Sequence, residues 1–245
     1  MNLNIIQPWL WPVISLCIAF FLVLMVQPSI ARIALVKNIS DPEDTEHKGI
    51  PQLTLGGIAV FIGITLSSIF CIRGHQFPGL QALISSMVVL LFTGMISDCR
   101  VHYQYFRSFS KIIAAIFIVL MGRIAPSVSQ LISPKWVSLC LQILAVTGFI
   151  YFYHYFTRLR QRYFLISGFI NALVFSIFFF CIQKYNFSVI SFALLGSLTG
   201  TIIYAQYAVR KKKPIARLGH TGIYMIAIVL AMLWLKVADI LISGI

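Results

Sequence analysis

Long apolar runs separated by short polar segments dominate the chain. The runs lack the two-residue alternation of a membrane β-barrel, and backbone amides in hydrocarbon must be satisfied within their own segment. We therefore predict an all-α, polytopic bundle of about eight transmembrane helices. The predicted helices lie at residues 9–26, 54–72, 79–97, 108–122, 136–153, 163–183, 187–208 and 218–242. The run at 108–122 is short, so seven spans are the alternative.

The composition indicates a membrane protein and excludes an ordinary soluble domain. Of the 245 residues, 60% are hydrophobic and 10% are charged, whereas roughly 25% are charged in soluble domains. Spans of ~20 residues leave room only for short loops, so residues 1–245 are expected to form one integral membrane domain. No basic residue precedes Arg32, so we expect the first helix to remain in the mature protein rather than to be a cleaved signal peptide.

Basic residues gather in alternate loops. Most of the 19 Lys and Arg residues follow the first, third, fifth and seventh helices. The positive-inside bias then places these loops in the cytoplasm and both termini outside. The net charge of +13 is spread over several loops and forms no single patch, which argues against DNA or RNA binding.

The six acidic residues are few enough to be weighed singly. Four lie between residues 41 and 46, in either a solvated loop or an anion or metal site at the membrane surface. Asp98, at the cytoplasmic end of the third helix, is either the partner of a nearby cation in a salt bridge or a ligand for magnesium or phosphate chemistry. Asp239 follows Lys236 by three residues, and a structural i,i+3 pair explains it.

Two basic segments each allow two interpretations. Residues 210–217 lead into the last helix, where cations and free backbone N–H groups suit a phosphate or a lipid head group. The simpler interpretation is a positive-inside anchor. Residues 158–162, which contain three arginines, allow the same two interpretations. His75, His102 and His154 lack the paired spacing of a zinc site.

Taken together, the cytoplasmic segments resemble the polyprenyl-phosphate glycosyl-1-phosphate transferases. This family includes undecaprenyl-phosphate N-acetylglucosamine-1-phosphate transferase and phospho-N-acetylmuramoyl-pentapeptide transferase. Residues 47–61 are similar to its first motif, with a histidine, a proline and a Gly-Gly-Ile helix start. Residues 94–98 and then 111–115 are similar to its Gly-x-x-Asp-Asp segment and the Lys and Ala-Ala that follow, and residues 219–222 match Gly-Asp-x-Gly-Ser in outline. The resemblance covers roughly residues 10–235.

The resemblance implies a multi-pass protein of the bacterial inner membrane that takes part in cell-envelope glycan synthesis, of the peptidoglycan, O-antigen or teichoic acid type. Family members transfer a sugar phosphate from a UDP-sugar to a polyprenyl phosphate, release UMP and use magnesium. On this basis Asp98 would hold Mg²⁺ and, with His47, would be catalytic. We also expect substrate contacts from Lys48, Arg107, Lys111 and His220, and from Arg158, Arg160 and Lys211, which would stand where the family holds its cation.

The sequence departs from the family at most of its acids. The Asp-Asp pair is Ser97-Asp98, the region near 154–168 has arginines where the family has acids, and His220 replaces the Asp of the third motif. The chain also ends about where the family continues into further helices. An arginine in place of an aspartate beside a magnesium site inverts the local charge. We therefore expect catalysis to be impaired or lost, and whether the protein is an enzyme stays open.

Several alternatives to an active transferase remain. The basic site is suited to binding polyprenyl phosphate or a nucleotide sugar without reaction, and the protein could pair with itself or with a complete transferase. A small membrane carrier would need polar residues along the bilayer midplane, where the predicted helices have almost no ionisable groups. The last alternative is a decaying gene product without function.

Overall fold

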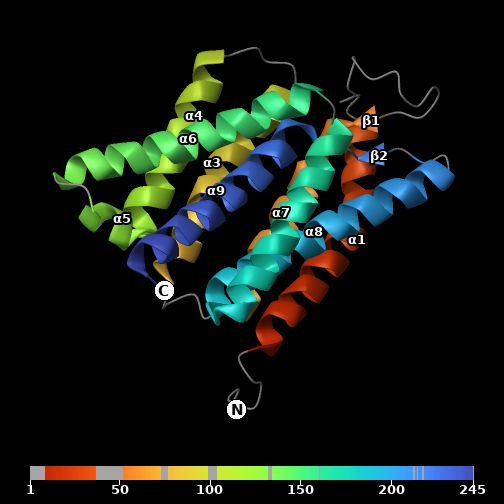
Figure 1. Ribbon diagram of the computed structural model, residues 1–245. Helices are drawn as coiled ribbons and strands as arrows, with labels where there is room; N and C mark the ends of the chain where they lie inside the picture. The colour runs from red at the N-terminus through yellow and green to blue at the C-terminus, as the bar shows by residue number, and fades with distance from the viewer. Residues whose placement is uncertain are drawn as a thin grey trace.

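The apolar runs of the sequence form the helices of the computed structural model (Figure 1). It describes residues 9–36, 52–72, 77–98, 104–131, 134–159, 161–211, 213, 215–216 and 218–244. The α-helices are α1 (Leu10–Val36), α2 (Gly57–Cys71), α3 (Pro78–Asp98), α4 (Gln104–Ile116), α5 (Pro126–Leu131), α6 (Lys135–Leu159), α7 (Gln161–Cys181), α8 (Tyr185–Arg210) and α9 (Gly219–Ser243).

Shorter elements complete these helices. A 3-10 turn, η2 (Thr54–Gly56), leads into α2, and a π-helical segment, η4 (Phe117–Met121), continues α4. Strands β1 (Gln52–Leu53) and β2 (Ile215–Ala216) pair in parallel, with Gln52 opposite Ile215. This pair joins the segment before α2 to the segment before α9.

The prediction of a polytopic helical membrane bundle is confirmed. In the described part of the chain, seven helical segments are long and apolar enough to cross a membrane. Each of the eight predicted windows contains a helix, and the fourth, α4 with η4, is the short run that is not among these seven. Helix α1 begins, and α9 ends, at the same end of the bundle (Figure 1). Which end is cytoplasmic stays a prediction.

Two predictions about the helices differ from the structure: the end of α1 was placed too early, and α5 was not predicted. Helix α1 continues ten residues beyond its predicted end at residue 26 and includes Arg32, which was assigned to a loop. Pro28 lies inside α1, where a proline removes one backbone hydrogen bond but does not necessarily end a helix. Helix α5 was not predicted, because six residues are too few to give a helical period.

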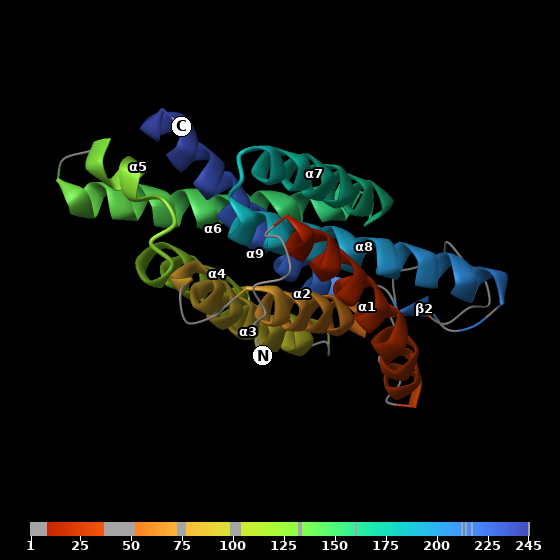
Figure 2. The same ribbon diagram turned by 90° about the horizontal axis from the view of Figure 1, so that it is seen from below.

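Helix α9 occupies the centre of the bundle. It contacts α2, α3, α5, α6, α7 and α8, and Figure 2 shows α6 and α7 on one side of it and α2 and α3 on the other. Residues 221–233 are all buried, as expected for a helix that is apolar all round.

Small residues let α1, α2 and α8 approach each other closely. A Cβ atom at Gly196 would lie 2.3 Å from the Leu16 carbonyl oxygen, and one at Gly63 would lie 2.7 Å from the Ser197 hydroxyl. Close backbone approach through small residues is how membrane helices gain packing energy when lipid and side chains are equally apolar.

An ion pair lies near the C-terminal end of α9. The Lys236 ammonium lies 2.6 Å from Asp239 Oδ2, which confirms the predicted i,i+3 pair. The Ser127 N–H donates to Asp239 Oδ1 (2.7 Å), and Lys236 also donates to the Ile124 carbonyl (3.3 Å). The pair therefore fixes the start of α5 against α9.

The glycine contact between α1 and α8 gives a stability test. Gly196→Ala should lower the free energy of unfolding by about 2 kcal/mol, because the new methyl group meets backbone that cannot rotate away. Gly148→Ala is the matched control, since a Cβ there meets no atom within 4 Å. Unfolding midpoints in detergent or nanodiscs check this. Equal midpoints for the two variants would contradict the close packing of α1 on α8.

The Lys236–Asp239 pair gives a second test. Asp239→Leu should lower the free energy of unfolding by about 3 kcal/mol, because it leaves a poorly solvated ammonium without its partner. Adding Lys236→Met in the same chain should recover part of that loss. A double-mutant cycle measures the coupling, and purely additive effects would show that the pair contributes nothing.

Candidate functional site

The carboxylate of Asp98 lies at the first turn of α9. Asp98 ends α3, and its Oδ1 accepts a hydrogen bond from the His220 N–H (2.8 Å). Its Oδ2 accepts hydrogen bonds from the Thr221 hydroxyl (2.7 Å) and the Thr221 N–H (3.3 Å). The first N–H groups of a helix have no partner within the helix, and the positive end of the helix dipole favours an anion. Asp98 therefore caps α9 from a neighbouring helix.

Glycines at the starts of α2 and α9 and near the end of α3 allow this contact. A Cβ atom at Gly57 would lie 2.1 Å from the Gly222 nitrogen, and one at Gly94 would lie 2.5 Å from the Thr221 Cα. Gly219 has a φ of +57°, and a Cβ there would lie 2.0 Å from the Thr54 carbonyl oxygen. Side chains at these positions would separate α2 and α3 from α9, so the glycines are required by the packing of the site.

A buried lysine lies beside the same turn. Lys111, in α4, is 2% exposed, and its ammonium lies 4.0 Å from the ring centroid of Tyr151 and 5.0 Å from that of Tyr224. In the described part of the chain it has no hydrogen-bond or ion-pair partner. Cation–π contacts contribute about 2 kcal/mol when desolvated, whereas desolvating a charge costs several kcal/mol. The described neighbours therefore compensate this burial only in part.

Two histidines and a buried tyrosine complete the group. The rings of His154, in α6, and His220 lie 5.3 Å apart, and both lie near Tyr224, at 5.5 and 6.2 Å between centroids. Tyr224 is fully buried, and its hydroxyl has no hydrogen-bond partner among the described residues. Arg107, one helical turn before Lys111, interacts electrostatically with Lys111 and Tyr224. We call Arg107, Lys111, Tyr151, His154, His220 and Tyr224 the Lys111 cluster.

The predicted site residues fall into three groups. Asp98, Arg107, Lys111 and His220, predicted from separate segments, lie around the start of α9. Lys211 is exposed and directly follows α8, whose end lies far from α4 in both Figure 1 and Figure 2. The rest lie outside the described side chains: His47, Lys48, Arg158 and Arg160.

Three members of the cluster were not predicted as site residues. Tyr151 and His154 lie one turn apart on α6, and Tyr224 lies one turn after His220 on α9. Residues three or four positions apart lie on the same face of a helix. This spacing alone is only a weak indication that their side chains belong to one cluster. His154 was considered only for zinc spacing along the chain, but its partner His220 comes from another helix.

The described residues do not fit a magnesium ion. Mg²⁺ prefers six oxygen ligands in octahedral geometry. The described acids are Asp98 and Asp239, which lie at opposite ends of α9, and both oxygens of Asp98 already accept hydrogen bonds. The described residues contain no group of three or more His, Cys, Asp and Glu side chains that could hold a metal ion. The acids at 41–46 lie outside the described part.

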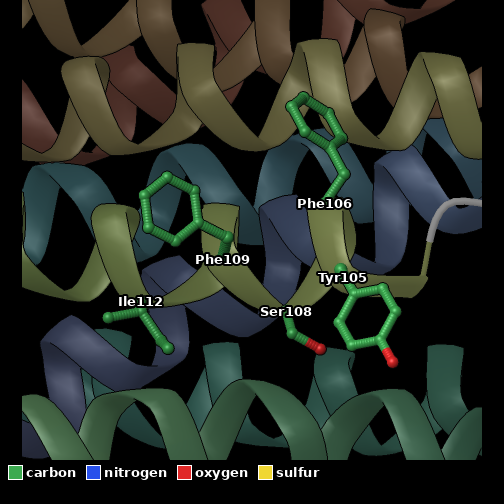
Figure 3. Close-up of a pocket in the computed structure, with 5 residues that line it drawn as sticks. All are labelled: Tyr105, Phe106, Ser108, Phe109 and Ile112. Carbon is green, nitrogen blue, oxygen red and sulfur yellow. The ribbon is translucent and has the colours of Figure 1, made fainter.

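The opposite face of α4 is apolar and open. Figure 3 shows five side chains that project from α4. They line an open depression of about 720 Å³ and are Tyr105, Phe106, Ser108, Phe109 and Ile112. The polar face of α4, with Lys111, is buried, and its aromatic side chains are exposed, which is the reverse of the arrangement in a helix of a soluble protein. A lipid environment favours this orientation, because lipid tails can contact the aromatic face.

The chain matches no protein-family model, and a search of curated proteins gives no significant match.

The Asp98 cap can be tested by stability. Asp98→Ala should lower the free energy of unfolding by about 2 kcal/mol, because it removes the side-chain acceptor of the His220 and Thr221 N–H groups. Asp98→Asn should cost less, since an amide oxygen still accepts, and Thr221→Val should remove only the hydroxyl contact. Chemical or thermal unfolding of the purified variants gives the order. Asp98→Ala with wild-type stability would exclude the capping role.

Proposed function

We propose that the protein is a divergent relative of the polyprenyl-phosphate glycosyl-1-phosphate transferases in a bacterial inner membrane. In this proposal its catalysis is impaired or lost, and it keeps a site for a phosphate-bearing substrate, either polyprenyl phosphate or a UDP-sugar. One observation carries the proposal: the segments that resemble three family motifs meet at the first turn of α9. Gly57 contacts Gly222, Gly94 contacts Thr221, and Asp98 binds the N–H of His220.

Loss of catalysis is supported by the chemistry of the described side chains. Metal-assisted phosphoryl transfer needs hard oxygen ligands around the metal and a positioned nucleophile. Here the one described acid at this end of the bundle caps a helix, and its neighbours are a lysine, an arginine and two imidazoles. These groups suit binding of an anion better than holding a cation.

Binding of a phosphate group is supported by charge and by location. Lys111 and Arg107 bring two positive charges into a largely apolar bundle, where an anion interacts more strongly than it does in water. A ligand at this end of α9 could leave its prenyl chain in the bilayer and present its phosphate to the cluster.

The test is UMP release by the full-length protein in detergent, supplied with UDP-N-acetylhexosamines, undecaprenyl phosphate and Mg²⁺. We expect none under conditions where a complete family enzyme turns over, together with measurable binding of undecaprenyl phosphate or the UDP-sugar. UMP release that disappears in Asp98→Asn, with the fold retained, would instead show a working transferase. Absence of both turnover and binding in folded protein would exclude the proposed function.

A further inference from the structure

We infer that the Lys111 cluster binds the phosphoryl group of its ligand directly, through its own cations and without a divalent metal. The inference rests on the proposed function for the class of ligand and adds the mode of binding. It places Lys111 and Arg107 where a metal-dependent site would hold its cation.

The first step is the state of Lys111. Lys111 is 2% exposed, its ammonium lies beside two aromatic rings, and among the described residues no hydrogen bond or ion pair joins it to another side chain. Arg107 lies on the same helix close enough to repel it. Two neighbouring cations in a medium of low dielectric constant favour an anion at this place.

The second step is the supply of donors for phosphate oxygens. The Tyr224 hydroxyl is buried without a partner among the described residues, and the ring of His220 lies 6.2 Å from the Tyr224 ring. Lys111 and Arg107 approach from α4, His154 from α6 and Tyr224 from α9. Donors from three helices can surround the oxygens of one phosphoryl group, as charge-assisted hydrogen bonds require.

The third step excludes a role of Asp98 as the counter-ion of Lys111. Asp98 interacts electrostatically with Tyr224 and so lies near the cluster. Its Oδ1 and Oδ2, however, accept hydrogen bonds from the first residues of α9 at 2.8 and 2.7 Å. Both oxygens of Asp98 are therefore directed to the helix terminus. Among the described residues, no ion pair joins Lys111 or Arg107 to a carboxylate.

The experiment measures binding of undecaprenyl phosphate to the full-length protein in phosphatidylcholine nanodiscs, once with Mg²⁺ and once with EDTA. A separate titration uses UDP-N-acetylglucosamine, which distinguishes the two sources of the phosphoryl group. Undecaprenol, the same lipid without phosphate, is the ligand control. We expect at least one phosphate ligand to bind with a Kd that EDTA does not change, and undecaprenol to bind far more weakly.

The variants identify the residues. Lys111→Met should weaken binding by about 30-fold or more, and Lys111→Arg should restore part of the affinity because it restores the charge. Tyr224→Phe removes only the hydroxyl and should weaken binding several-fold. Lys184→Met is the matched control, because it removes the same charge from an exposed position at the other end of the bundle. Size-exclusion profiles and unfolding midpoints establish that each variant is folded.

Each outcome decides between the two proposals. Binding that needs Mg²⁺, or that folded Lys111→Met retains, overturns this inference and leaves the proposed function standing. Failure of folded wild-type protein to bind either phosphate ligand overturns both. If Lys111→Met does not fold, Lys111→Arg and Tyr224→Phe carry the test, and wild-type affinity in Tyr224→Phe together with a requirement for Mg²⁺ would reject the inference.

Discussion

The backbone N–H groups in the first turn of α9 need hydrogen-bond acceptors, although apolar helices surround this turn. Asp98, at the end of α3, provides the acceptors for two of them. Backbone N–H groups without acceptors are costly in such surroundings. The carboxylate can reach them only because Gly94 and Gly57 let α3 and α2 touch the backbone of α9. The cap therefore fixes the rotation of α9, and the rotation in turn brings His220 and Tyr224 towards Lys111 and His154. The packing of three helices and the composition of the cluster depend on the same contact.

This contact also changes the chemistry that the site can perform. A carboxylate that accepts hydrogen bonds on both oxygens is less available as a metal ligand than one that points into a solvated cleft. The positive end of the α9 dipole is capped by the carboxylate of Asp98. In the proposed function, a ligand supplies the anion for the two cations of α4. Under that proposal, Asp98 stabilises the helix and the cations of α4 attract the anion of the ligand.

The sequence predicts the helices well and the cluster poorly, for physical reasons. Hydropathy identifies a membrane helix because the bilayer imposes its length and composition, and the Lys236–Asp239 pair follows from spacing within one helix. The rotation of a helix about its axis is set by contacts between residues distant in sequence. The sequence therefore does not show which of the three tyrosines in residues 151–155 faces the cluster. Tyr151 lies under Lys111, Tyr153 accepts a hydrogen bond from Asn171, and Tyr155 is exposed. The contact between Asp98 and His220 joins two helices distant in sequence, so no spacing along the chain predicts it.

Helix α4 shows why burial of a charge is informative in this protein. A lysine that only anchors a helix at the membrane surface can extend to water, as long basic side chains near helix ends do. Lys111 lies seven residues after the start of α4 and faces the interior of the bundle, whereas the aromatic side chains of α4 face outward. Its ammonium therefore cannot extend to water in this way. Its burial lowers the stability of the unliganded protein, and any anion that it binds raises that stability by mass action. If the proposed ligand binds at Lys111, folding and ligand binding are coupled through this one side chain.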